Sequence, residues 1–594
     1  MNVLGLKIEG HDPGASLIAG GRIVAIAEER LNRVKHSQGI FPKLSIDYCL
    51  SALAVSDKEI DLIVIDHTSR QSGGNIERMF RAQMGERFST TKIEVISHHN
   101  AHAASAFLCS PFMEAAVLVY DGRGSMVRTE MGTQLVETES LMRGEGSELT
   151  TIDKWYHALL PQRGTPFLCG IGMFYDQLCV HYLSLGKHNH GKMMGLAAYG
   201  DDSFLKRFPY EKWMTERNGE LVLNGDWRFA PNPGNLPRLS LIASLVKLRN
   251  YVVSLLRSTV LWLTRQHEVR VFEQIVFPRP ARNPSKDTLP DKYYSSVAYM
   301  GQKVFERFAV ELGQKLKTIT KSENLCVSGG CALNIDANRN FLTEVGFKNL
   351  FVQPASSDCG IALGCALWGY HIILKQPRNW VMKSTSLGRP YTTAEIDEAI
   401  EKRKDEIEWR VSPHIAKETA QLIANNNIVG WFQGGSEYGP RALGNRSILC
   451  DARNKDMRDV LNKRVKHREM WRPFATSILA EKLGDWFDLQ PNATTAFMLL
   501  CGTVHEHKRT EVPSIVHVDN TCRMQTLTKE DNGIYYDLVK EFENQTGVPL
   551  VLNTSFNLGG DPIVETPYDA LDTFLHTDMD YLVLEDRIIQ KRSS

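Results

Sequence analysis

The feature that most constrains the fold is a unit that occurs twice in the N-terminal half. The chain opens with a predicted strand "NVLGLKI", a polar turn "EGHDPGA", and two further strands, "SLIAGG" and "RIVAIAEE". From Ala115, "AAVLVYDGRGSM" again places an apolar run before Asp, Gly and Ser, and "RTEMGTQLVETESL" continues the strand-like alternation. A strand unit used twice predicts an internal duplication.

A short segment, "HHNAHAASAF", carries His98, His99 and His102 within five positions. On a helix His98 and His102 lie one turn apart on the same face, and such a pair can hold a metal ion. The chain has 18 histidines, so the spacing alone also arises by chance. A metal site needs three or four ligands, and we expect carboxylates from aspartates at strand ends to complete it.

Length and composition limit the classes of protein. With 594 residues the chain is expected to form about two to four domains. The 69 basic and 69 acidic residues balance, so no overall field attracts nucleic acid or a membrane, and any anion site is local. Eleven cysteines without a CxxC pair, several in apolar runs, predict reduced thiols in a cytoplasmic protein. The N-terminus lacks the pattern of a signal peptide.

The most apolar stretch runs from Leu239 to Thr264 and is interrupted by Lys247, Arg249 and Arg257. Inserting these cations into a bilayer would cost several kcal/mol, so no stable membrane insertion is expected. The leucines follow helical spacing, which predicts an amphipathic helix packed on its own domain. A cap over an apolar acceptor or a contact with a membrane surface is the alternative.

Two later segments place polar groups at strand ends. In "NLCVSGGCALN" a strand meets Gly329 and Gly330 at the start of a helix, a junction that can offer backbone N–H groups to phosphate or can serve geometry alone. In "VQPASSDCGIALG", Asp358 follows a strand and precedes a helix of small residues. A turn-rich and then highly charged segment follows, and we expect a domain boundary around residues 376–390.

The C-terminal part holds the densest polar signal, "GPRALGNRS" to "REMWRPFA". A solvated helix face would explain the charges from Lys463 to Arg468. It does not explain Arg441 or Arg472, whose Pro, Ala and Trp neighbours indicate positioned anion ligands. Arg523 follows in "HVDNTCRMQTL". A strand that ends in polar side chains then predicts the rim of a small-ligand site: Asn553, Ser555 and Asn557.

In order, "GHDPGAS", "HHNAHAASAF", "YDGRGS", "GKMMGLAAYG", "VSGGCALN", "GPRALGNRS", "REMWRPFA" and "NTSFN" resemble the NodU and CmcH family of O-carbamoyltransferases, from Val3 to about Tyr581. The resemblance implies an α/β fold. Its N-terminal domain, residues 1–375, would be a duplicated actin-like ATPase (ASKHA) domain of the tRNA threonylcarbamoyltransferase type, with a variable insertion about 205–285. Residues 390–594 would form a YrdC-like domain.

The resemblance also implies a reaction. The C-terminal domain would convert carbamoyl phosphate and ATP to carbamoyl adenylate and pyrophosphate, and the N-terminal domain would transfer the carbamoyl group to an alcohol. The acceptor would be a small molecule, a natural product or sugar of secondary metabolism, whose identity the sequence does not encode. A divalent metal, typically Fe(II), with Mn, Mg or Zn as alternatives, would be held by four residues: His98, His102, Asp121 and Asp358.

Further roles carry over by motif. His11, with Asp12 beside it, would be the base that takes the hydroxyl proton, although a turn residue that caps its loop is the alternative. The catalytic cations of the C-terminal domain would be Arg441, Lys466, Arg472 and Arg523. The nucleotide and carbamoyl phosphate contacts would be Asp121, Gly122, Gly124, Lys192, Gly329, Gly330, Asn334, Asn445, Asn553, Ser555 and Asn557. One departure is His190, where relatives commonly carry an acidic residue.

Two other functions are compatible with parts of the pattern. A transferase that acts on tRNA would need a basic face, whereas this chain is neutral, and we expect no nucleic-acid partner. A non-catalytic nucleotide sensor would not need both the four-residue metal set and the arginines. The two-domain design is compatible with a homodimer.

Overall fold

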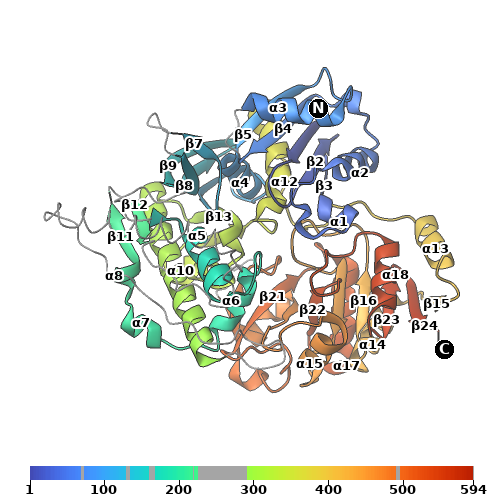
Figure 1. Cartoon of the computed structure of the whole chain (residues 1–594). Coiled ribbons are helices and arrows are strands. Elements are labelled where there is room, and N and C mark those ends of the chain that lie inside the picture. The colour runs from blue at the N-terminus through green and yellow to red at the C-terminus, as the bar shows by residue number, and fades with distance from the viewer. Residues whose placement is uncertain are drawn as a thin grey trace, which may run out of the picture.

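The computed structural model describes residues 1–68, 73–128, 134–158, 168–217, 220–224, 291–489 and 495–592. The apolar segment 239–264 and most of the expected insertion, 205–285, lie outside the described residues. Two sheets form the N-terminal part and one large sheet forms the C-terminal part, shown in red and orange in Figure 1. A small sheet of β10 (Leu168–Cys169), β11 (Met214–Arg217) and β12 (Glu220–Asn224) lies beside them.

The first sheet has the strand order β3-β2-β1-β4-β5. A hairpin at Gly20 and Gly21, both with positive φ, joins β2 to β3, and β1 pairs antiparallel with β2 and parallel with β4. The parallel connections require helices, α2 (Lys43–Leu53) and α3 (Gly73–Met84). The strands are β1 (Val3–Lys7), β2 (Gly14–Ala19), β3 (Arg22–Ala27), β4 (Leu62–His67) and β5 (Lys92–Ser97).

The second sheet repeats this plan in the order β9-β8-β6-β13-β14, with β7 (Met126–Arg128) added beside β8. Its first two pairings are antiparallel and its last two are parallel, as in the first sheet. The predicted duplication is therefore confirmed. The strands are β6 (Glu114–Tyr120), β8 (Gln134–Glu145), β9 (Glu148–Ala158), β13 (Asn324–Ser328) and β14 (Asn349–Val352).

Two short helices lie between the sheets (Figure 1). α12 (Ile361–Leu367) packs on β1, β2 and β4, α4 (His98–Phe107) packs on β6 and β13, and the two helices contact each other. Their backbones touch because Gly364 lacks a side chain: a Cβ there would lie 2.0 Å from the Ala101 carbonyl oxygen. On the second sheet, α10 (Lys292–Thr320) packs against β6 and against α11 (Ile335–Thr343).

The C-terminal sheet is mixed and ordered β15-β24-β23-β16-β17-β22-β18-β21-β20-β19. α14 (Ile415–Ala424), α17 (Gly533–Thr546) and α18 (Pro567–Leu575) pack on it. Its strands are β15 (Ile407–Val411), β16 (Val429–Phe432), β17 (Arg446–Cys450), β18 (Ala475–Leu479), β19 (Phe487–Asp488), β20 (Cys501–Val504), β21 (Thr521–Leu527), β22 (Leu550–Ser555), β23 (Tyr581–Leu584) and β24 (Arg587–Lys591).

The C-terminal part has its own apolar core, a buried cluster that draws only on residues from Ile396 to Ile589. Before it, residues 375–392 form no helix or strand apart from one bridge, Ser386 to Glu437. The expected boundary around 376–390 falls in this stretch and stays a prediction. The two parts are nevertheless tightly packed, since Trp471 and residues 497–500 belong to the buried cluster of the second sheet. Within the described ranges, no helix has both the length and the apolar character needed to cross a bilayer.

Candidate metal centre and anion site

Polar residues gather where the parallel strands of both N-terminal sheets end. Lys7 is the last residue of β1, Asp66 lies near the end of β4, and His98 follows β5 directly as the first residue of α4. Asp121 follows β6, and Ser328 ends β13. The carboxyl ends of parallel strands meet at one edge of a sheet, which is where open α/β folds bind ligands. The duplication thus brings two such edges together.

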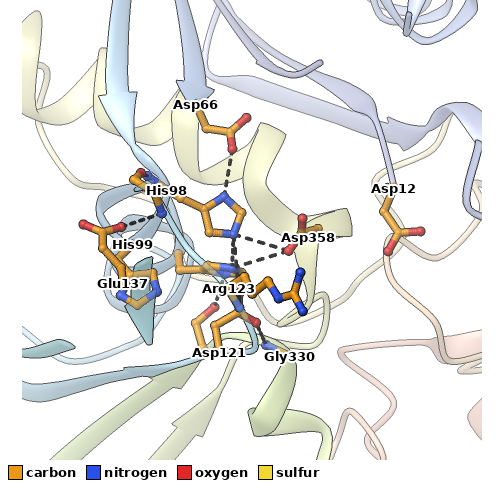
Figure 2. Close-up of polar contacts among 12 residues, drawn as sticks. Asp12, Asp66, His98, His99, Asp121, Arg123, Glu137, Gly330 and Asp358 are labelled. Carbon is orange, nitrogen blue, oxygen red and sulfur yellow. Dashed lines mark hydrogen bonds and ion pairs between the residues drawn. The ribbon is translucent and has the colours of Figure 1, made fainter. Parts of the chain in front are cut away.

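Figure 2 shows His98, Asp121 and Asp358 pointing toward one another, and His102 joins them. The His98 and His102 Nε2 atoms are 3.2 Å apart, and His98 Nε2 lies 3.6 Å from Asp121 Oδ2 and 3.3 Å from Asp358 Oδ1. One atom from each residue lies within 4.8 Å of the other three, and all four residues are buried. The structure therefore brings together the four residues expected to hold a metal. We call them the four-ligand cluster.

Outer partners fix the orientation of these ligands. Asp66 Oδ2 lies 2.8 Å from His98 Nδ1, and Ser328 Oγ lies 3.1 Å from His102 Nδ1. Both rings are thereby held with Nε2 toward the centre. Asp121 Oδ1 accepts a hydrogen bond from the Gly330 N–H at 2.8 Å, which leaves Oδ2 facing His98.

The protonation states follow from burial and charge. Burial lowers the pKa of His102 to about 3, with a further contribution from the charge of His98, so this imidazole is neutral and available as a ligand. Burial also opposes a charged His98, but Asp358, Asp121 and Asp66 offset it and raise the pKa well above the usual range. The His98 proton keeps the pKa of Asp358 well below its ordinary value despite burial. A cation can replace this proton.

The donor set fits a divalent cation. Two imidazole nitrogens and two carboxylate oxygens, with second ring nitrogens already bonded, form the mixed nitrogen and oxygen set that suits Fe(II), Mn(II) or Zn(II). His99 is not among the residues whose ligand atoms converge within 4.8 Å, and its Nδ1 bonds Ser140 Oγ at 2.7 Å. The four residues could thus hold a divalent cation, and both the metal role and the choice among metals stay predictions.

His11 and Asp12 lie to one side of the cluster, as the position of Asp12 in Figure 2 shows. His11 Nε2 is 3.9 Å from Asp358 Oδ2, and its Nδ1 is 3.1 Å from Asp12 Oδ2. Asp12 has a φ of 55° and also contacts His36 Nδ1 at 2.7 Å. The Asp358 charge raises the pKa of His11 to about 9. His11 therefore faces the cluster rather than only capping its loop.

Three of the four glycines expected at the nucleotide allow close packing or form hydrogen bonds within the protein. Gly329 has a φ of 96°, and a Cβ there would lie 2.1 Å from the Tyr120 carbonyl oxygen. Its N–H donates to the Ser356 carbonyl at 2.9 Å, and that of Gly330 donates to Asp121. At Gly124 a Cβ would meet the His99 ring at 2.6 Å, whereas Gly122 has open space. The N–H donors expected for phosphate at 329 and 330 are thus engaged within the protein.

Two other expected nucleotide contacts also have protein partners. Asn334 caps α11 by accepting from the Ala337 N–H at 3.1 Å, and its side-chain amide exchanges two hydrogen bonds with Gln302, both 3.0 Å. Lys192 in α6 (His190–Ala197) forms an ion pair with Glu469 at 2.9 Å. His190, the expected departure from the motif, lies 2.9 Å from Asp176.

The cations expected in the C-terminal part interact with one another. Burial lowers the pKa of Arg441, and the charges of Arg523 and Arg472 lower it further. Burial likewise lowers the pKa of Arg523 to about 10. An anion bound among these cations would offset both the burial and the repulsion. Including Arg468, whose pKa burial and the same charges lower, these residues form what we call the cationic cluster: Arg441, Lys466, Arg468, Arg472 and Arg523.

The partners of this cluster leave donors free. Among the described residues, Arg441 Nε and Arg523 Nε are buried without a hydrogen-bond partner. Arg472 has an ion pair, with Glu469 at 3.7 Å. Buried donors without acceptors are costly. The arrangement is therefore that of a site for anionic groups.

The polar rim is used partly by the protein. Lys466 Nζ donates to Asn557 Oδ1 and to its carbonyl, both at 2.9 Å, and to Ser555. Asn553 Oδ1 is buried without a partner, so it is free to accept. Asn445 instead bonds Ser386 and the Gly435 carbonyl, at 3.1 and 2.8 Å, and holds the turn before β17. Asn445 therefore acts structurally in this arrangement.

Sequence reasoning missed several residues of the site. Lys7 and Asp66 are hidden in apolar strands, and Arg468 was counted as part of a solvated helix face. His36 and His188 stack on each other, with centroids 4.2 Å apart, beside His11. A buried Lys in "NVLGLKI" and an Asp in "LIVIDH" were the available signals, since charged residues within apolar strands need partners.

Comparison with known proteins settles the family. Residues 2–87 and 75–367 match the model described as carbamoyltransferase N-terminus, and residues 420–591 match carbamoyltransferase C-terminus. The chain belongs to the carbamoyltransferase family. The family predicted from the motifs is confirmed, and the protein is a carbamoyltransferase enzyme.

Named relatives of this carbamoyltransferase include nodulation proteins. It is 32% identical to NolNO of Sinorhizobium fredii over 98% of this chain and 79% of that protein. It is 31% identical to NolO of Bradyrhizobium diazoefficiens over 84% of this chain and 79% of that protein. Among solved structures, HypF of T. kodakarensis covers 63% of this chain and 48% of its own, with 14% identity and a TM-score of 0.32.

In the carbamoyltransferase, α6 joins the N-terminal part to the segment that carries the cationic cluster. Glu469 bridges Lys192 of α6 and Arg472 of the cationic cluster. His517 Nε2 lies 3.1 Å from the Gly195 carbonyl of the same helix. The segment that carries the cationic cluster is therefore in direct contact with the N-terminal part.

Proposed function

We propose that the protein is an ATP-dependent O-carbamoyltransferase that activates carbamoyl phosphate at the cationic cluster and transfers the carbamoyl group at the four-ligand cluster. The observation that supports this is the coexistence of the two sites. One gathers cations with unpaired buried donors, and the other gathers two imidazoles and two carboxylates. An enzyme that only moved a neutral group would need neither.

In the first step, water releases phosphate from carbamoyl phosphate, and the carbamate oxygen attacks the α-phosphorus of ATP. The P–O bond to the β-phosphate breaks, so the products are carbamoyl adenylate, pyrophosphate and phosphate. Both reactants are polyanions that repel each other. Arg441, Arg472 and Arg523 would neutralise this repulsion and hold the charge of the transition state.

In the second step, the acceptor hydroxyl oxygen attacks the carbamoyl carbon and the bond to AMP breaks. The four-ligand cluster would hold a divalent cation, which would polarise the carbamoyl or phosphate oxygen and, by offsetting the charge of Asp358, lower the pKa of His11. His11 would take the hydroxyl proton at Nε2, with Asp12 holding Nδ1.

The finer assignments belong to the same proposal. The duplicated N-terminal part would be an actin-like ATPase domain, 1–375, and the part from 390 a YrdC-like domain. The acceptor would be a hydroxyl of a natural product or sugar, and the native metal Fe(II). Transfer to tRNA is not favoured, because the chain is neutral and its named relatives are nodulation proteins.

The test is pyrophosphate release from ATP and carbamoyl phosphate without acceptor. Arg472→Ala is expected to lower the rate roughly 30- to 5000-fold, since removing one cation of such an anion site costs about 2–5 kcal/mol. Lys463→Ala, which removes an exposed cation of the neighbouring segment, is the control and should leave the rate unchanged. If Arg472→Ala released pyrophosphate at the normal rate, the activation step would be assigned to the wrong residues.

A further inference from the structure

Lys7 is a buried lysine at the end of an apolar strand, with a side chain that is 1% exposed. Its Nζ lies 3.6 Å from Asp66 Oδ2 and 3.5 Å from Asp358 Oδ2, and it donates to the Glu9 carbonyl at 2.5 Å. A lysine this deeply buried requires such partners. No role in the proposed reaction has so far been given to it.

Lys7 bridges two carboxylates that have different roles at the four-ligand cluster. Asp66 supports His98 through Nδ1, whereas Asp358 is itself one of the four ligands. The two oxygens of Asp358 are divided between the two directions. Oδ1 faces His98 Nε2 at 3.3 Å and His102 Nε2 at 3.9 Å, while Oδ2 faces Lys7 at 3.5 Å.

Lys7 also sets the charge of the region. Asp66, Asp121 and Asp358 contribute three negative charges and Lys7 contributes one positive charge, so the sum with neutral histidines is −2. A divalent cation neutralises this sum. Without Lys7 the sum would be −3, which would hold a cation more tightly and leave it a weaker electrophile.

We infer that Lys7 is a positioning residue that occupies Asp358 Oδ2, so that Asp358 binds the cation through Oδ1 alone and a coordination position stays open for the transferred group. The inference rests on the proposed function, since it needs a cation at the four-ligand cluster. It concerns the number of coordination positions left open on the cation and the affinity of the site for that cation. The four ligands by themselves determine neither.

The experiment uses Mn(II) alone as the probe, titrated into the full chain, with water proton relaxation as the measure of exchangeable waters on the ion. In Lys7→Met, Asp358 Oδ2 loses the lysine and keeps only the more distant His11 Nε2 at 3.9 Å, so this oxygen becomes available to the cation. Mn(II) is expected to bind roughly tenfold more tightly, because a neighbouring positive charge is gone, and with lower relaxation enhancement per bound ion. Carbamoyl transfer should fall while pyrophosphate release stays normal.

Lys7→Gln separates the two effects. Its amide still donates to Asp358 Oδ2 but carries no charge, so Mn(II) should bind more tightly while the relaxation enhancement stays near that of the wild type. It also serves if Lys7→Met does not fold. Lys154→Met is the matched control: this lysine is mostly buried and pairs with Glu137 at 2.7 Å, and it should change neither quantity.

The outcomes separate the inference from the proposed function. If wild-type protein bound no Mn(II), the proposed metal site would be lost and the inference with it. If it bound Mn(II) but Lys7→Met and Lys7→Gln left both affinity and relaxation unchanged, the inference alone would be overturned. Weaker Mn(II) binding in both variants would likewise overturn it, because a purely structural lysine predicts that result.

Discussion

The four-ligand cluster and the cationic cluster solve opposite electrostatic problems. In the first, carboxylates and a protonated imidazole compensate one another within the protein, with distances of 3.3 and 3.6 Å between His98 and its two aspartates. In the second, cations lower one another's pKa values and leave buried donors unpaired. The charges of the four-ligand cluster are compensated without a bound ligand, whereas those of the cationic cluster are not. The stability of the cationic cluster should therefore depend more strongly on what it binds.

The sharpest way to test this contrast is to disable each cluster separately. Asp358→Asn removes a ligand charge and is expected to weaken Mn(II) binding about 100-fold or more, while acceptor-independent pyrophosphate release stays within about twofold. Arg523→Met should lower pyrophosphate release roughly 30-fold or more and leave Mn(II) affinity unchanged. Both are measured by Mn(II) titration and a pyrophosphate assay. A variant that impaired both readings equally would show that the clusters work as one site.

A smaller effect is expected on stability when two arginines are replaced, one with an unpaired buried donor and one whose donors are paired. Arg441→Met removes a cation with an unpartnered buried Nε, so the free energy of unfolding without ligand should stay equal or rise by about 1 kcal/mol. Arg446→Met removes donors to the Gln433 and Asn445 carbonyls, both at 2.9 Å, and should lower it by about 3 kcal/mol. Urea unfolding with and without pyrophosphate measures both.

Pyrophosphate should stabilise the wild type and Arg441→Met unequally, because Arg441 is one of the groups that bind it. Equal stabilisation of the two proteins would place Arg441 outside the anion site. A loss of stability in Arg441→Met as large as in Arg446→Met would mean that Arg441 has partners in the folded protein.

The effect that is smallest near neutral pH is a pH dependence at His99, which adjoins the four-ligand cluster without joining it. Burial lowers the pKa of His99 to about 4, below the ordinary value of 6.5. As pH falls from 6.5 toward 4, the unfolded chain takes up a proton that the folded chain does not, so stability falls by up to about 1.4 kcal/mol per pH unit. His99→Gln should reduce this slope, measured by urea unfolding with chelator present. The exposed His414→Gln is the control, and equal slopes in both variants would contradict the assignment.

Sequence patterns predicted the features of the molecule that depend on residues close together in the chain and on the order of motifs. The repeated strand unit predicted the duplication that the two sheets confirm. The helical spacing of His98 and His102 placed both on one face, and the motif resemblance added Asp121 and Asp358, which the structure brings beside them. The arginines with apolar neighbours also lie near each other, since the charge of Arg472 contributes to lowering the pKa of Arg441 after burial.

What the sequence did not reveal depends on contacts between distant segments. The interpretation of Lys463 to Arg468 as a solvated face fails for Lys466, which is buried against Ser555 and Asn557. The partners of Gly330 N–H and of Asn334 could not be read either, since hydrogen-bond partners on other elements leave no periodic signal. Lys7 lies on β1 and Asp66 on β4, two strands that are far apart in the sequence and adjacent in the sheet.

The contact between α4 and α12 has a consequence for which ions the protein can use. His98 begins α4, His102 follows Ala101, and Asp358 opens the turn (Asp358–Gly360) that leads into α12, so the close approach of Ala101 and Gly364 holds these ligands near one another. Replacing that hydrogen atom of Gly364 with a methyl group would push α4 and α12 apart and widen the space that the ligands enclose, so a smaller ion would fit it less well.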